Sequence, residues 1–190
     1  MSFVPFGARS HASVARGTVL AGARLIDADT VDGVAAALKA ENVRLLVITS
    51  VTSALARLPD IDIAAAATMG RKAGIPVLLD DAYGARLRPI LHGGPRSLAF
   101  DVDLAITNCD KAGLEGPRAG FMAGRADLVA RVQAKAAEQG QEARAPIALA
   151  VLRALERFSE ALLREEVEVG AETGRASPHV REATAHLSST

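Results

Sequence analysis

The sequence predicts a three-layer α/β fold built on a mainly parallel sheet. From about residue 30 onward, short apolar runs of strand length alternate with stretches that have helical spacing, and this alternation is typical of βαβ units. The run at 43–49 (VRLLVIT) is almost continuously apolar. Such a pattern indicates a strand that helices cover on both faces, which is the usual setting of a parallel strand.

The first half of the chain contains one clear βαβ unit. After a helix at 34–40 and the strand at 43–49, a second helix is expected at 61–72. Asp60 is its candidate N-cap and Gly74 follows its end, as the chemistry of helix ends favours. The strand 77–80 then completes the unit, and the segment 86–100 mixes helix and turn signals around a GGP turn.

The second half continues with strands at 103–107 and 119–124 (AGFMAG). The connection between them is too short for a crossover helix, so they are expected to be antiparallel or separated in the sheet. Amphipathic helices are predicted at 126–139 and from 146 to about 167. We therefore expect one domain over residues 1–168 and a polar, poorly ordered tail over 169–190.

Composition excludes several classes of function. The 190 residues hold 22 Lys plus Arg and 22 Asp plus Glu, so no net charge draws the chain to nucleic acid or to an anionic membrane. No apolar run approaches the roughly 20 residues of a membrane helix. The N-terminus lacks the order of a secretory signal and Cys109 is the single cysteine, which together predict a cytoplasmic protein. No CxxC or HExxH occurs, so we expect no metal.

Two clusters of polar residues fall at the ends of predicted strands. Asp80 and Asp81, in DDAYG, close the strand 77–80, while Asp110 and Lys111 follow the strand 103–107. Ligands of open α/β sheets bind at the carboxyl ends of the strands. A lysine that faces such a crevice beside a carboxylate can become the nucleophile of Schiff-base chemistry.

These residues match the needs of pyridoxal 5'-phosphate (PLP). That cofactor requires a lysine for its internal aldimine, an anion that keeps its pyridine nitrogen protonated, and donors for its phosphate. Lys111 and Asp80 can supply the first two. Tyr83, three residues after Asp80, would leave the same strand end and could reach the phenolic oxygen of the cofactor.

The strings GIPVLLDDAYGARLRPIL (74–91) and DLAITNCDKAGLEGPRAGFMAGRADLVARV (103–132) resemble fold-type I PLP-dependent enzymes. Within that class the chain is most similar to the archaeal PLP enzymes that are themselves similar to bacterial selenocysteine synthase, L-seryl-tRNA(Sec) selenium transferase. The resemblance runs from about Pro5 to Phe158. It implies the large domain of the aspartate aminotransferase-like fold, in partial form.

The resemblance also implies roles for individual residues. Lys111 takes the place of the aldimine lysine, Asp80 that of the ring-nitrogen acid, and Ala82 lies under the ring beside Tyr83. His11, in SHASV, matches a histidine placed over the ring. Where the family commonly has Ser three residues before the lysine, this chain has Asn108, with Thr107 beside it; either could donate to the phosphate.

The implied reaction is a PLP-dependent transferase or lyase step at the β-carbon of an amino acid substrate such as serine or phosphoserine, by elimination and replacement. Desulfurase-like or aminotransferase-like chemistry stays open, because one fold hosts many reactions. Active sites of this class commonly form between subunits, so the full-length protein is expected to be a homodimer or larger. The Gly-rich phosphate-binding segment and the small C-terminal domain of the class are not recognisable here.

Two other interpretations compete with this one. A phospho-acceptor receiver module also uses an acid pair, a Thr and a Lys, but it needs the acid pair on its first strand and a separate acceptor Asp. A catalytically incomplete PLP-binding remnant, or a partner-binding subunit, remains the alternative. Among single residues, Cys109 is expected to be buried and structural, and Arg86 and Arg88 to bind an anion or to lie on the surface.

Overall fold

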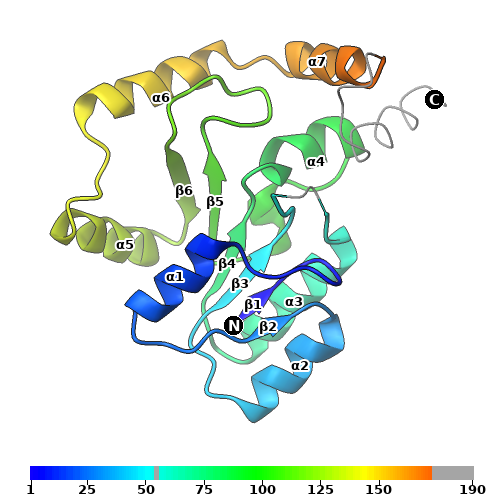
Figure 1. The fold of residues 1–190 in the computed structure, drawn as a ribbon, viewed down its shortest axis with the longest axis vertical. Helices are drawn as coiled ribbons and strands as arrows, with labels where there is room; N and C mark the ends of the chain where they lie inside the picture. Colours follow the sequence, from blue (N-terminus) through cyan, green and yellow to red (C-terminus); the bar gives the residue numbers. More distant parts are fainter. Residues whose placement is uncertain (54–55, 173–190) are drawn as a thin grey trace.

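The computed structural model describes residues 1–53 and 56–172. In this part of the chain, six strands form one sheet in the order β2-β1-β3-β4-β5-β6 (Figure 1). The strands are β1 (Ser2–Phe3), β2 (Asp27–Ala28), β3 (Leu46–Thr49), β4 (Val77–Asp80), β5 (Leu104–Asn108) and β6 (Gly120–Gly124). The helices are α1 (Ala12–Leu20), α2 (Val31–Ala40), α3 (Asp60–Lys72), α4 (Gly84–His92), the 3₁₀ turn η1 (Ser97–Phe100), α5 (Ala126–Glu138), α6 (Ala145–Arg157) and α7 (Glu160–Glu172).

The sheet is parallel except at one edge. The neighbouring strands from β2 to β5 pair in parallel, and β6 pairs antiparallel with β5. This confirms the mainly parallel α/β prediction and the antiparallel expectation for 119–124. In Figure 1, α2 lies at the β2 side of the sheet and α5 lies beside β6.

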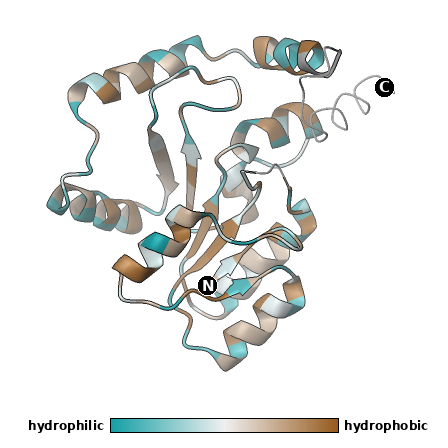
Figure 2. Ribbon diagram, in the orientation of Figure 1, coloured by the Kyte–Doolittle hydropathy of each residue, from teal (hydrophilic) through white to brown (hydrophobic). Residues whose placement is uncertain are grey.

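The main core lies between the central strands and helices α2 and α3. Leu46, Ile48 and Leu79 of the strands are fully buried against Ile63 and Ala66 of α3, and Figure 2 shows the central strands in apolar colours. A second, smaller core joins α4 to α7 through Ile90, Leu91, Leu163 and Val167. It anchors α4, whose first residues follow the end of β4.

Several element boundaries differ from the sequence prediction. Pro59, not Asp60, is the N-cap of α3, and Asp60 instead pairs with Arg57 and Arg88 from the first turn. The mixed segment 86–100 forms α4 and η1, with Gly93 in the left-handed conformation (φ +61°) that ends α4. A glycine adopts that conformation without the steric cost of a side chain.

The long helix predicted from 146 to about 167 is two helices. Phe158 has extended backbone angles (φ −61°, ψ 129°) and ends α6, and α7 begins after Ser159, whose Oγ accepts a hydrogen bond from the N–H of Leu162. Helix α7 continues to Glu172, past the predicted domain end at 168. The rest of the predicted tail, 173–190, lies outside the described residues. No helix in the described ranges is both long and apolar enough to cross a membrane.

Candidate functional site

The carboxyl ends of β3, β4 and β5 form one wall of a cavity of about 370 Å³. Thr49 of β3 and Asp80 of β4 are paired in register, and Asn108 ends β5. Because side chains alternate between the two faces of a strand, these three can project from the same face of the sheet, and all three line the cavity. The topology therefore brings residues that are far apart in the sequence to one edge.

Most of the residues singled out in the sequence meet in this cavity: its wall includes His11, Asp80, Ala82, Tyr83, Asn108 and Lys111. Asp80 comes from the end of β4, and Ala82 and Tyr83 from the turn that leads into α4. Lys111 lies in the loop after β5. His11 is the N-cap of α1, where its Nδ1 accepts a hydrogen bond from the N–H of Ser13 at 3.2 Å.

Asp80 is a half-buried carboxylate whose ionised form is disfavoured. Burial raises the pKa of Asp80, and the negative charge of Asp81 raises it further. The N–H of Ala82 and the nearby charge of His11 act in the opposite direction. A cationic or N–H donor placed in the cavity would relieve this penalty, because opposite charge favours the ionised carboxylate.

Lys111 lies at the same cavity with its side chain about a quarter exposed. Its Nζ donates to Oδ1 of Asp110 at 3.0 Å and lies 5.9 Å from the centre of the Tyr83 ring. The hydrogen bond from Lys111 lowers the pKa of Asp110. The amine thus lies near one other residue of the cavity wall, Tyr83, and its side chain is partly accessible to solvent.

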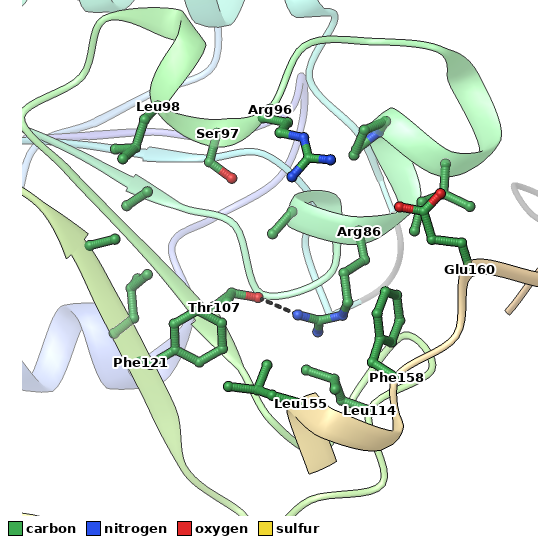
Figure 3. A pocket seen from close by; sticks show the side chains of 16 residues that line it. Arg86, Arg96, Ser97, Leu98, Thr107, Leu114, Phe121, Leu155, Phe158 and Glu160 are labelled. Atoms are coloured by element: carbon green, nitrogen blue, oxygen red, sulfur yellow. Dashed lines mark hydrogen bonds between the residues drawn. The ribbon is translucent and has the colours of Figure 1, made fainter. Parts of the chain in front are cut away.

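Thr107 is not brought into the cavity. It is adjacent in the strand to Asn108 and so points to the opposite face of the sheet. Its hydroxyl accepts a hydrogen bond from Arg86 at 3.2 Å (Figure 3). The same hydroxyl donates to the carbonyl of Ala82 at 3.3 Å. A separate cavity of about 400 Å³ lies on that side, walled largely by apolar side chains such as Leu114, Phe121, Leu155 and Phe158.

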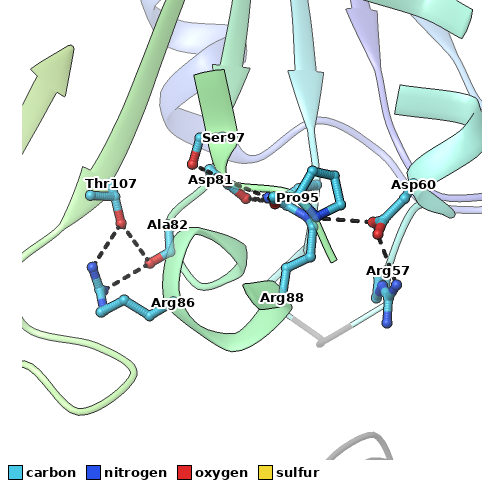
Figure 4. Close-up of polar contacts among 10 residues, drawn as sticks. Arg57, Asp60, Asp81, Ala82, Arg86, Arg88, Pro95, Ser97 and Thr107 are labelled. Carbon is cyan, nitrogen blue, oxygen red and sulfur yellow. Dashed lines mark hydrogen bonds and ion pairs between the residues drawn. The ribbon is translucent and has the colours of Figure 1, made fainter. Parts of the chain in front are cut away.

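The second acid of the DDAYG sequence has a different environment. Asp81 is fully buried, and its carboxylate accepts hydrogen bonds from Ser50 at 2.5 Å, from Ser97 at 2.6 Å and from both Nη atoms of Arg88 at 3.1 and 2.6 Å (Figure 4). Arg88 also lies 4.9 Å from the centre of the Phe100 ring. Asp81 is therefore satisfied by the fold, whereas its neighbour Asp80 lines the cavity.

Arg86 and Arg88 are only 8% and 3% exposed. The expectation that they bind an external anion or lie on the surface is therefore wrong, because internal oxygens occupy their donors. Cys109 is fully buried, as expected for a structural cysteine.

Sequence reasoning assigned no site role to several further residues of the cavity wall, among them Arg9, Thr49 and Arg118. Arg9 and Arg118 contribute positive charge. Thr49 is 5% exposed, and its Oγ1 is a buried atom with no hydrogen-bond partner among residues 1–53 and 56–172. A buried hydroxyl without a partner is costly, so an unpaired one in a cavity wall suits a site that binds a polar ligand. The sequence signal that could have identified Thr49 is its position at the end of the predicted strand 43–49, because the ends of parallel strands lie at one edge of the sheet and Thr49 is paired with Asp80.

No protein-family model matches the chain. A curated protein from Methanothermobacter thermautotrophicus, named "UPF0425 pyridoxal phosphate-dependent protein", is 43% identical over 124 residues, which are 65% of this chain and 33% of that protein. A protein of the same name from Methanosphaera stadtmanae is 30% identical over 125 residues, 66% of this chain and 32% of that protein. The chain thus spans about a third of the length of these curated relatives.

Solved structures share the fold. N-succinyldiaminopimelate aminotransferase from Mycobacterium tuberculosis superposes with a TM-score of 0.69 at 23% identity, over 90% of this chain and 48% of that enzyme. These likenesses confirm the resemblance inferred from the sequence strings. The chain is accordingly a homologue of part of the archaeal UPF0425 proteins and has the fold of fold-type I PLP-dependent enzymes.

Proposed function

We propose that the protein binds PLP in the cavity between Asp80 and Lys111 and uses it to act on an amino acid. The observation that carries this proposal is the convergence of one amine and one carboxyl group, from the ends of neighbouring parts of the sheet, on the same cavity. The names of the homologous proteins, each called pyridoxal phosphate-dependent, support the same cofactor.

The side chains of the cavity wall have the chemistry that PLP requires. Asp80 is a carboxyl group whose charge is penalised by burial, and a protonated ring nitrogen is the kind of partner that would compensate it. The unpaired Oγ1 of Thr49 and the guanidinium groups of Arg9 and Arg118 at the wall provide donors for an anionic group such as the cofactor phosphate or a substrate carboxylate.

The chain's own groups have distinct tasks in this proposal. When bound, PLP supplies a ring that withdraws electrons from the α-carbon of an amino acid. Asp80 would keep the proton on the ring nitrogen, and Lys111 would hold the cofactor aldehyde and move the proton at the α-carbon. Tyr83, Ala82, His11 and Asn108 would orient the ring from the cavity wall.

For the reaction we propose selenocysteine synthase-like chemistry, an elimination and replacement at the β-carbon of a substrate such as serine or phosphoserine. This finer assignment rests on the resemblance of the sequence strings. The alternative is a catalytically incomplete PLP-binding remnant or partner-binding subunit.

The decisive experiment is to incubate the purified chain with PLP, record its visible spectrum, reduce it with borohydride and map the labelled peptide. We expect the pyridoxyl group on Lys111 and loss of the label in Lys111→Ala, while Lys135→Ala serves as the matched control on an exposed helix. A label on Lys39, Lys72 or Lys135 in place of Lys111 would refute the site.

A second measurement separates the two candidate functions. Exchange of the α-proton of L-serine or phosphoserine in deuterated water, followed by NMR, reports proton transfer without requiring the full reaction. Exchange that depends on PLP and on Lys111 supports the enzyme. A chain that takes the label on Lys111 and exchanges no α-proton supports the remnant.

We also propose that the full-length protein is a homo-oligomer. Helix α6 is amphipathic and has no buried residue, and its Leu149 and Leu152 are 63% and 56% exposed. Exposed apolar side chains in a row are typical of contact surfaces. Light scattering on the full-length protein tests this, and a monomer at micromolar concentration would contradict it.

A further inference from the structure

Arg86 of α4 connects the two segments that carry the proposed site. Its Nε donates to the carbonyl of Ala112 at 2.9 Å, and its Nη2 donates to the carbonyls of Asn108 at 2.9 Å and Lys111 at 2.8 Å. Its Nη1 donates to Thr107 Oγ1 at 3.2 Å. One buried guanidinium therefore binds the backbone at Lys111, at the next residue and three residues before Lys111.

The loop that Arg86 holds has an unusual shape. Ala112 has a positive φ of 49° and Gly113 one of 77°, and a residue with a side chain seldom adopts such angles without support from its surroundings. This turn directs the carbonyls of Lys111 and Ala112 to Arg86. Without the guanidinium, these oxygens would lose charge-assisted hydrogen bonds in a partly buried place.

The other end of Arg86 is fixed to the acid segment. Arg86 lies in the first turn of α4, which begins directly after Tyr83, and Thr107, its hydrogen-bond partner, donates in turn to the carbonyl of Ala82 (Figure 4). Movement of the Lys111 loop away from the Asp80–Tyr83 segment would break these contacts together.

We propose that Arg86 is a positioning residue that sets the place of Lys111 relative to Asp80. The proposal rests on the proposed function of those two residues. Arg86 acts from the opposite face of the sheet and is not itself a contact of the cavity. The planar fork of arginine reaches several carbonyls at once, and the single ammonium of lysine cannot replace it.

The chain offers a matched control two residues away. Arg88 is also buried in α4, but it binds Asp81, the carbonyl of Pro95 and Asp60, and none of these partners lies in the Lys111 loop. Arg86→Lys and Arg88→Lys therefore make the same chemical change in the same helix. Both replace a planar guanidinium with a single ammonium at a buried site, but only Arg86→Lys removes hydrogen bonds to the Lys111 loop.

The test measures hydrogen exchange of residues 109–116 in the cofactor-free chain, at a temperature where circular dichroism shows both variants folded. In Arg86→Lys we expect exchange in this loop to accelerate about tenfold or more, as expected for loss of a charge-assisted hydrogen bond. In Arg88→Lys the loop should keep the wild-type rate. Limited acetylation of Lys111, scaled to the exposed Lys72 in the same sample, should change in Arg86→Lys alone.

Unchanged loop exchange in Arg86→Lys, or an equal increase in both variants, would overturn the positioning role. Neither hydrogen exchange nor acetylation requires PLP, so both test the positioning role even if the proposed function fails. Failure of the wild-type chain to take a pyridoxyl label on Lys111 would overturn the proposed function and leave this test intact. If the label does form, its yield at equal PLP concentration should fall in Arg86→Lys and hold in Arg88→Lys.

Discussion

The two adjacent acids of the DDAYG segment should respond in opposite ways to the same substitution. Asp81→Asn removes the negative charge that receives two hydrogen bonds from buried Arg88, together with those from Ser50 and Ser97. Asp80→Asn removes a charge that burial already disfavours. The first change should destabilise the fold, and the second should not.

The magnitude follows from what each change leaves behind. Removal of one partner from a buried ion pair costs about 3–5 kcal/mol. Arg88 keeps a weaker pairing with Asp60 at 3.4 Å, so we place Asp81→Asn at the lower end, about 3 kcal/mol. For a chain of this size that corresponds to a fall in melting temperature of about 6–12 °C. Asp80→Asn should stay within about 0.5 kcal/mol of the wild type, or be slightly more stable.

The assay is urea unfolding at pH 7, followed by far-UV circular dichroism, on the wild type and both variants. Loss of less than about 1 kcal/mol in Asp81→Asn would show that the four hydrogen bonds have little net effect on stability. Equal losses in the two variants would refute the division between a structural and a site carboxylate.

Further predictions concern the same region. The pKa of Asp80 is raised above its ordinary value of 3.8 in the folded state. The stability that comes from its protonation is therefore present at low pH and is lost as the pH rises through the folded pKa. Urea midpoints should fall across this pH range in the wild type and fall less in Asp80→Asn. Thr49→Val should leave the cofactor-free chain as stable or up to about 1 kcal/mol more stable, because the deleted hydroxyl has no hydrogen-bond partner in the described part of the chain. The same change should weaken PLP binding in a spectroscopic titration, and a clear loss of stability would contradict the prediction. Gly84→Ala should lower the melting temperature by circular dichroism, since a Cβ there would collide with Asp81 Oδ1 and lie 2.8 Å from Arg88 Nη2; an unchanged melting temperature would mean that the cluster can rearrange.

The sequence predicts the central part of the fold well for physical reasons. The predicted bounds of strand β4, 77–80, agree with the structure, because a short apolar run between Pro76 and two acids indicates a strand of that length. Strands β1 and β2 have two residues each, too few for any periodicity, and they exist through their pairing in the sheet. The break at Phe158 was missed because apolar spacing continues across it into α7; the capping residue Ser159 was the overlooked signal.

The site was predictable where it depends on strand ends. Asp80 ends β4 and Lys111 lies just after β5, so their position at one edge of the sheet follows from the parallel pairing of these strands. Thr107 was chosen for its chemistry without regard to the alternation of β5, which turns its side chain toward Arg86. The buried roles of Arg86 and Arg88 could not be anticipated, because an arginine in sequence is ordinarily a surface residue.

The pairing of β4 with β5 has a consequence for how this architecture tolerates change. The separation of the acid and the amine depends on hydrogen bonds between two adjacent strands, in which Asp80 faces Ile106, and on the short loop after β5. The intervening turn after α4 is exposed at Gly93. Residues inserted in that turn would lengthen the polypeptide between the two groups without moving them apart in space, so length variation there is compatible with an unaltered candidate site.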